Sequence, residues 1–107
     1  MNNLFEQIPE QLPKELTSVL LQSSQLRIER IVSKGQASAA DSWYQQTEHE
    51  WVLLLQGDAI LEFEQPLRQQ PLLSGDFILI PAGVRHRVQY TSSNPVAIWL
   101  CIFYPDG

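Results

Sequence analysis

From Leu26 to Tyr104 the sequence is a series of short runs of strand-forming residues separated by turn residues. Gly, Pro, Asn, Asp and Ser mark the turns, and no run between them has helical periodicity. The expected strands are Leu26–Ile31, Glu50–Gln56, Ala59–Glu64, Phe77–Ile80, His86–Tyr90 and Val96–Tyr104. Many short strands with regular turns and no intervening helix are typical of an antiparallel barrel or jelly roll. The pattern therefore predicts an all-β fold.

Only the first quarter of the chain has a helical pattern. Apolar residues share one helical face, and a proline stands where the first turn tolerates it. These residues are Leu12, Leu16, Val19 and Leu20, with the proline at Pro13. The pattern predicts a short N-terminal helix within residues 1–24, packed on the outside of a barrel that spans residues 25–105. A chain of 107 residues is the usual size of one domain.

Composition excludes several classes of protein. An apolar fraction of 44% argues against disorder, and a net charge of −5 argues against a surface that binds nucleic acid. The longest apolar runs, Trp51–Leu55 and Val96–Phe103, fall far short of the ~20 residues of a membrane helix. The first residues have neither a basic start nor an apolar stretch, so a cytoplasmic location is expected. The single cysteine, Cys101, is expected to be a buried, inert thiol.

The segment from Gly75 to His86 reads Gly-Asp-Phe-Ile-Leu-Ile-Pro-Ala-Gly-Val-Arg-His. A short strand ends at Pro81, Gly83 allows the positive φ of a sharp turn, and His86 opens the next strand. In that strand His86, Val88 and Tyr90 are expected on one inward face. The spacing of Gly, Pro, Gly and His resembles the second sequence motif of the cupin superfamily.

Half of the first cupin motif is also present. Glu50 and Gly57 have its spacing, and the strand Ala59–Glu64 follows them. In cupins two histidines precede this glutamate, but here the corresponding slots hold Tyr44 and Gln46, or Trp43 and Gln45 if the gap is one residue longer. The resemblance covers about Arg27 to Phe103. It implies a cupin-type antiparallel β-barrel, a double-stranded β-helix or jelly roll.

The resemblance places Glu50 and His86 at metal-ligand positions that approach each other across the barrel. Gln46 can add an amide oxygen, and such a donor set suits Zn, Fe, Mn, Ni or Co. The alternative is a buried hydrogen-bonded pair without metal, in which Glu50 serves as an acid or a base. Both readings make Glu50 and His86 the candidate catalytic residues.

The expected pocket lies at the mouth of the barrel, where it would bind a small molecule. Trp43, Tyr44, Val88 and Tyr90 are its expected walls, with core packing as the alternative for the two aromatic residues before Gln45. His49 directly precedes Glu50, so a strand there would point it to the opposite face and into solvent. Arg85 is expected on a solvated face or beside an acidic residue, with an anionic ligand at the mouth as the alternative.

The last strand is apolar on both faces. Val96, Ile98, Leu100 and Ile102 alternate with Ala97, Trp99, Cys101 and Phe103. An antiparallel strand with one wet face would alternate with polar residues, so either the N-terminal helix or another subunit is expected to cover the second face. The cupin resemblance implies a homodimer, which a charge at an interface position such as Trp99 is expected to disrupt.

Three functional classes remain open on the sequence. The first is a module that binds a small molecule, the second a metal-dependent enzyme of the dioxygenase or isomerase kind, and the third a regulatory or partner domain with a filled pocket. Tyr44 and Gln46 replace two imidazoles, and a Gln amide neither accepts a proton near neutral pH nor holds a metal as imidazole does. This substitution favours binding over catalysis.

Overall fold

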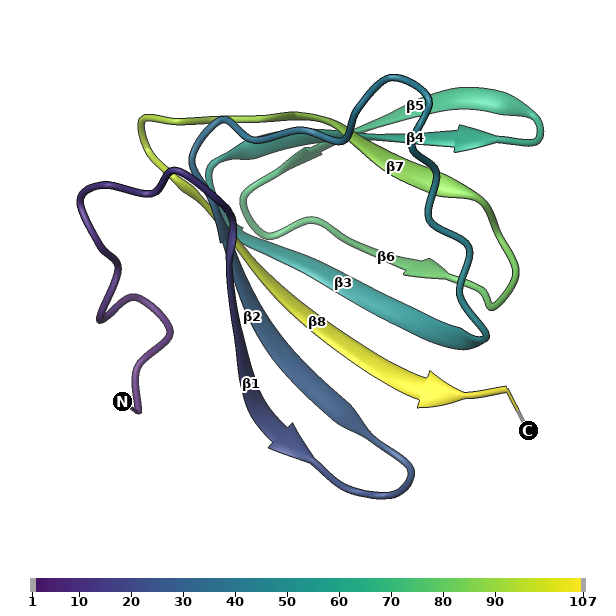
Figure 1. Ribbon diagram of the computed structural model, residues 1–107, viewed down its shortest axis with the longest axis horizontal. Helices are drawn as coiled ribbons and strands as arrows, with labels where there is room; N and C mark the ends of the chain where they lie inside the picture. The colour runs from purple at the N-terminus through teal and green to yellow at the C-terminus, as the bar shows by residue number, and fades with distance from the viewer. Residues whose placement is uncertain (1, 107) are drawn as a thin grey trace.

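The computed structural model describes residues 2–106, which form two antiparallel β-sheets that face each other (Figure 1). The strands are β1 (Leu16–Gln22), β2 (Arg27–Ser33), β3 (Glu48–Gln56), β4 (Asp58–Glu64), β5 (Leu67–Leu73), β6 (Phe77–Ile80), β7 (His86–Thr91) and β8 (Ala97–Pro105). One sheet has the order β1-β2-β8-β3-β6 and the other the order β5-β4-β7. The all-β antiparallel prediction is confirmed.

Apolar side chains from the inner faces of both sheets form the core. From the larger sheet come Val52, Leu54, Ile80, Ala97, Trp99, Cys101 and Phe103, and from the smaller sheet Ala59, Leu61, Phe63 and Leu72. These residues alternate with outward-facing ones along each strand, as the strand period of two requires. In the part of the chain that the structure describes, no helix has the length and apolarity needed to span a membrane.

The prediction of an N-terminal helix is wrong. The residues expected to form it lie in an extended segment and in β1, which pairs with β2 along its whole length. Leucines spaced for a helical face also suit a strand, because Thr17 and Val19 are β-branched and β2 supplies the backbone partners. Pairing with a neighbouring strand therefore overrides the helical periodicity.

A second element, β5, has no counterpart among the predicted strands. Its middle reads Arg68-Gln-Gln-Pro71, which lacks the apolar alternation of a half-buried strand. β5 lies at the edge of the three-stranded sheet and pairs only with β4. An edge strand tolerates proline, because one row of its amide groups has no sheet partner to lose.

Two glycines of the cupin-like motifs stand where the backbone needs them. Gly57, between β3 and β4, has a φ of 89°, and a Cβ there would meet Ser92 Oγ at 2.5 Å. Gly83 has a φ of 83° in the turn between β6 and β7, as predicted. Both values lie in the left-handed region that favours glycine. The turn at Gly57 follows β3, the strand of Glu50, and the turn at Gly83 precedes β7, the strand of His86.

β7 contains a bulge that reverses its faces. Leu61 pairs with Val88 and Ile60 pairs with Tyr90, so Gln89 is an extra residue without an opposite partner on β4. The bulge turns Tyr90 to the outer face beside Ile60, where its exposed fraction is 43%. Tyr90 was expected to face inward with His86 and Val88, and this expectation is corrected.

One end of the outer face of the larger sheet is covered by the extended N-terminal segment, not by a helix. Arg30 Nη1 donates hydrogen bonds to the carbonyls of Leu4 and Glu6, at 3.3 and 2.6 Å. Val32 and Ile98, which pair beside it on this face, have no exposed surface. The N-terminal segment therefore supplies part of the cover that the apolar last strand required (Figure 1).

Candidate functional site

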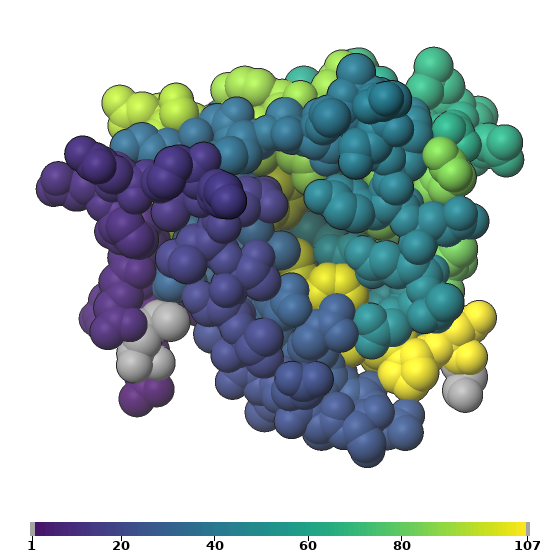
Figure 2. Space-filling view, viewed as in Figure 1, coloured from purple at the N-terminus to yellow at the C-terminus, as the bar shows by residue number. Residues whose placement is uncertain are grey.

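A cavity of about 300 Å³ lies between the two sheets. The face of the molecule drawn in Figure 2 is hollowed near its centre, where atoms of β8 are visible. Its polar lining consists of Glu15, Thr17, Arg27, Glu29, Tyr44, Gln46, Glu50 and His86. Its apolar and thiol lining consists of Ile31, Val52, Leu61, Ile80, Val88, Trp99, Cys101 and Phe103. The mixture of apolar walls and a few converging polar groups is typical of a small-molecule site.

Glu50 and His86 meet across this cavity. Glu50 stands on β3 in the larger sheet and His86 opens β7 in the smaller sheet, and their exposed fractions are 8% and 5%. His86 Nε2 lies 3.7 Å from Glu50 Oε1, which is an ion-pair distance and longer than a normal hydrogen bond. The two residues are thus close enough to share a ligand or a proton.

The backbone fixes the orientation of the His86 ring. His86 Nδ1 lies 3.0 Å from the Val84 carbonyl, so Nδ1 carries a proton and donates it there. Nε2 then points at Glu50 with a lone pair in the neutral ring and a proton in the charged ring. Burial lowers the pKa of His86, but the Glu50 carboxylate and the Val84 carbonyl raise it by more, so the pKa lies above its ordinary value.

This shift predicts a pH dependence of folding. The folded state binds the His86 proton more tightly than the unfolded state, so the contribution is complete below about pH 6.5 and is lost as pH rises through the folded pKa. We expect metal-free wild type to lose its stability advantage over His86→Gln in that direction. Denaturant unfolding of both proteins, in chelator across this range, measures the difference. An advantage that grows with rising pH would contradict the prediction.

The segment before β3 places Tyr44 and Gln46 beside His86. Tyr44 and His86 exchange two backbone hydrogen bonds, of 2.7 and 3.0 Å, and Gly83 donates its N–H to the Gln46 carbonyl. The Tyr44 and His86 ring centroids are 5.9 Å apart. The side-chain Oε1 of Gln46 is buried and has no hydrogen-bond partner in the structure. A buried acceptor of this kind has room in its hydrogen bonding for a water, a ligand donor or a cation.

Cys101 lies on the inner face of β8 and lines the same cavity. Burial raises the pKa of its thiol well above the ordinary value, and the neighbouring Glu50 carboxylate raises it further. The burial that the sequence predicted is confirmed. A protonated thiol beside Glu50 acts as a weak hydrogen-bond donor and not as a nucleophile.

Several residues considered in the sequence analysis lie away from the cavity. Trp43 is half-buried, with the guanidinium of Arg87 5.6 Å from its ring centroid, and does not line the cavity. His49 faces away from Glu50, accepts the Ala82 N–H at Nδ1 and lies 2.9 Å from Asp106. Its position on the opposite face agrees with the strand alternation, although these contacts leave it only partly exposed.

The arginines around His86 and the interface candidate also have defined places. Arg85 pairs with Glu64 at 2.8 Å, which agrees with the expectation of an acidic neighbour. Trp99 is only 4% exposed and faces the cavity. Trp99 belongs to the β8 residues that face inward. It therefore cannot be the interface position on the outer face that the sequence analysis expected.

Four polar lining residues were missed by the sequence analysis. Arg27 and Glu29 alternate with Ile28 and Arg30 in the predicted strand, but nothing in a single strand says which set faces inward. Glu15 and Thr17 belong to the segment that was predicted as helix, so their place beside a strand was hidden. In the structure Thr17 pairs with Ile31 of β2, and both residues line the cavity.

The donor set accommodates a metal only weakly. Within residues 2–106 no group of three or more His, Cys, Asp or Glu side chains is arranged to hold a metal ion. One imidazole nitrogen and one carboxylate face each other, and Gln46, whose Oε1 is buried without a hydrogen-bond partner, also belongs to the cavity lining. This set fits a divalent ion that retains water ligands, and it lacks the donors of a tight transition-metal site.

Comparison with known families and structures agrees with the fold and the motifs. Residues 29–103 match the family model described as cupin domain. The chain belongs to the cupin family. No curated protein matches the sequence.

Solved cupin structures superpose closely on this chain. A Ralstonia eutropha protein that carries the provisional name mannose-6-phosphate isomerase is 36% identical, with a TM-score of 0.94 over 99% of this chain and 98% of its own. A cupin superfamily protein from Desulfitobacterium hafniense is 22% identical, with a TM-score of 0.77 over 92% and 84% of the two chains. An RmlC-like cupin from Methanocaldococcus jannaschii, 14% identical, has a TM-score of 0.72 over 92% and 87%. The last two likenesses concern the fold alone.

Proposed function

We propose that this cupin binds a small polar molecule in the cavity around Glu50 and His86. The observation that carries the proposal is a cavity of about 300 Å³ in which a buried carboxylate and a buried imidazole face each other at 3.7 Å, with Gln46 also in the lining. These groups favour a ligand that donates hydrogen bonds, since most of them are acceptors. The apolar walls would exclude water from the bound molecule.

A divalent metal is part of this proposal. Gln46, Glu50 and His86 would hold it, with His86 Nε2 available because Nδ1 is occupied by the Val84 carbonyl. When bound, the ion would polarise a ligand oxygen as a Lewis acid. The chain's own contribution is to fix the imidazole, to keep Glu50 buried beside it and to exclude bulk water.

We expect the metal to be weakly held. Purified protein should contain substoichiometric Zn, Fe, Mn, Ni or Co that brief chelation removes, because only two strong donors face each other. His86→Ala should abolish uptake, and His49→Ala, at the histidine on the opposite face, should leave it unchanged. Elemental analysis of untagged protein before and after dialysis measures this. Stoichiometric metal that survives long dialysis against chelator would show that further ligands exist.

Isomerisation is the second candidate function. The name of the Ralstonia eutropha protein and its 36% identity favour this reaction class among the enzymes. The Glu50 carboxylate would take the proton from the hydroxyl-bearing carbon next to a carbonyl, while protonated His86 gives its proton to the carbonyl oxygen, which its raised pKa assists. Glu50 would then return its proton to the former carbonyl carbon as His86 takes the proton of the neighbouring hydroxyl, which becomes the new carbonyl. No redox step is needed.

Glu50→Gln separates the two candidates. For a binding module we expect ligand affinity to fall about tenfold or more, because a charge-assisted hydrogen bond is lost. For an isomerase we expect turnover to fall about 10²-fold to 10⁴-fold while the barrel stays folded. A thermal-shift screen with and without added metals, followed by NMR detection of product, measures both. Glu64→Gln, which removes a carboxylate paired with Arg85, is the matched control.

The outcomes of this screen distinguish a binding module, an enzyme and a partner domain. Stabilisation without product supports the binding module. Metal-dependent product that disappears in Glu50→Gln supports the isomerase, and oxygen consumption would point to a dioxygenase. Silence of the wild type with every class of small molecule would contradict the proposal and favour a partner domain.

We also propose a homodimer through the outer face of the larger sheet. An apolar row, defined here as the outer row, takes one residue from each of the five strands. In register order these residues are Leu21, Ile28, Ile102, Trp51 and Leu79. Leu21 and Leu79 are 48% and 46% exposed. Two copies that meet through this same patch would form the isologous contact of a twofold dimer.

A further inference from the structure

The ionisable lining of the cavity is predominantly acidic. Glu15, Glu29 and Glu50 contribute three carboxylates, and Arg27 is the only lysine or arginine among the lining residues that the structure describes. Protonated His86 would add a second positive charge. The lining is therefore negative with either state of the imidazole, and a dianionic ligand would meet Coulomb repulsion inside a partly dry cavity.

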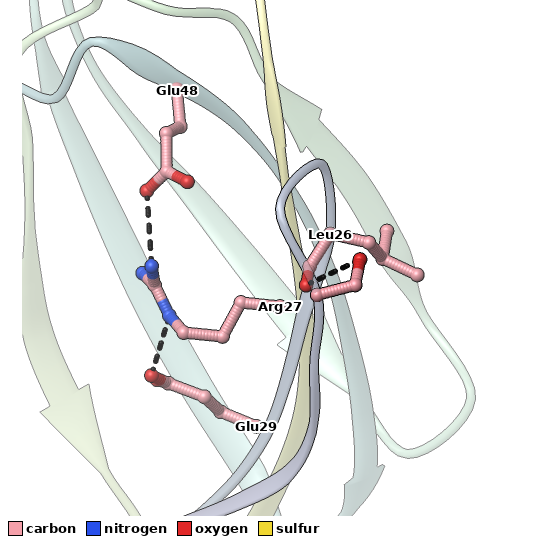
Figure 3. Close-up of polar contacts among 5 residues, drawn as sticks. Leu26, Arg27, Glu29 and Glu48 are labelled. Carbon is pink, nitrogen blue, oxygen red and sulfur yellow. Dashed lines mark hydrogen bonds and ion pairs between the residues drawn. The ribbon is translucent and has the colours of Figure 1, made fainter.

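Arg27 is already engaged by two carboxylates. Its Nε donates to Glu29 Oε2 at 2.8 Å and its Nη1 lies 3.3 Å from Glu48 Oε1 (Figure 3). The guanidinium carbon also lies 4.2 Å from the centroid of the Phe103 ring. A phosphate at this point would have to displace a carboxylate or lie beside both. The arginine is held as a neutralised part of the wall and not as an anion receptor.

Three other basic residues have partners outside the cavity. Arg85 pairs with Glu64 and Arg87 with Glu62, both with carboxylates of β4. Lys34 Nζ donates to the Glu10 carbonyl. None of these groups lines the cavity, so within the described residues a phosphate there would meet Arg27 as the only lysine or arginine.

The polar lining of the cavity is rich in acceptor oxygens. Besides the three carboxylates, Gln46 Oε1 is buried with no partner. Hydroxyl groups of a ligand would donate to these acceptors, and the aromatic side chains of Tyr44 and Trp99 in the lining can contact its C–H groups. We propose that the cavity binds an uncharged polyhydroxyl compound, a free sugar or polyol, and discriminates against the corresponding phosphate ester. This inference rests on the small-molecule binding proposed above.

The test compares matched pairs of ligands on the full chain. Mannose with mannose 6-phosphate, and fructose with fructose 6-phosphate, are titrated by calorimetry and thermal shift, in chelator and again with Mn(II) or Zn(II). We expect at least one free sugar to bind, and its ester to bind at least about tenfold more weakly in both conditions. Equal or tighter binding of the ester by the wild type overturns the proposal and leaves the binding function standing.

A charge-reduction variant tests the physical cause. Glu29→Gln removes one carboxylate of the lining and releases Arg27 from its shortest contact. We expect this variant to gain affinity for the ester by about tenfold relative to the free sugar. Glu64→Gln, which releases Arg85 away from the cavity, is expected to change neither affinity. Circular dichroism and the melting temperature establish that both variants are folded. An unchanged preference in folded Glu29→Gln would overturn the electrostatic explanation.

Two further outcomes separate this inference from the proposed function. Binding of a small amine such as ethanolamine, with no sugar bound, would overturn the polyol assignment while keeping the binding function. No shift with sugars, esters, amines or carboxylic acids, with or without metal, would overturn both.

Discussion

Leu54→Ala is expected to lower the free energy of unfolding by about 2–5 kcal/mol. Leu54 has no exposed surface and packs in the core between the two sheets. Its truncation removes apolar contacts and leaves a cavity that the strands, held by hydrogen bonds on both sides, can only partly close. Since small domains are stable by about 5–15 kcal/mol, this is a large share of the total. Urea unfolding followed by fluorescence measures it.

The matched control is Leu67→Ala. Leu67 begins β5 beside the hairpin turn and is 71% exposed, so the same truncation there should stay within about 0.5 kcal/mol of wild type. Equal losses in the two variants would mean that Leu54 is not the core position that the structure makes it.

Ile102→Asp is expected to convert the proposed homodimer into a monomer. Ile102 stands in the middle of the outer row, between Trp51 and Ile28, so a twofold contact would bury two introduced charges. Burial of an aspartate in place of an isoleucine should raise the dimer dissociation constant about a hundredfold or more. Light scattering and sedimentation at tens of micromolar measure the mass.

Leu67→Asp supplies the control for the assembly test, because it places the same charge on the other sheet, outside the outer row. It should leave the mass unchanged. A wild-type protein with monomer mass at this concentration would contradict the dimer proposal directly. The outer row would then remain exposed in solution.

Much of the candidate site could be read from the sequence, because its key residues are fixed by local geometry. Gly57 and Gly83 mark turns that need positive φ, and the strands next to them carry Glu50 and His86. A period of two along each strand then places Glu50 inward and His49 outward, as the structure has them. The spacing of the motif residues along the chain therefore predicted which of these side chains face inward.

The walls of the site depended on which strands pair with one another. Arg27 and Glu29 enter the cavity only because β2 pairs with β8, and Glu15 and Thr17 only because β1 adds to β2. The residues that set the charge of the cavity thus come from strands that carry no motif. Their shared location is a property of the sheet order and not of any one segment.

The sequence by itself determined the strands with clear alternation and the two glycine turns, since each depends on residues close in the chain. The facing pair Glu50 and His86, whose members lie on strands of different sheets, was predicted from the cupin resemblance. Tertiary structure alone decided that residues 16–22 form an edge strand and that the bulge at Gln89 turns Tyr90 outward. A leucine-rich segment satisfies a helical and a strand pattern equally well, and an extra residue is recognisable only against a partner strand. Backbone hydrogen bonding to a partner strand made both choices, with β2 as the partner of β1 and β4 as the partner of β7.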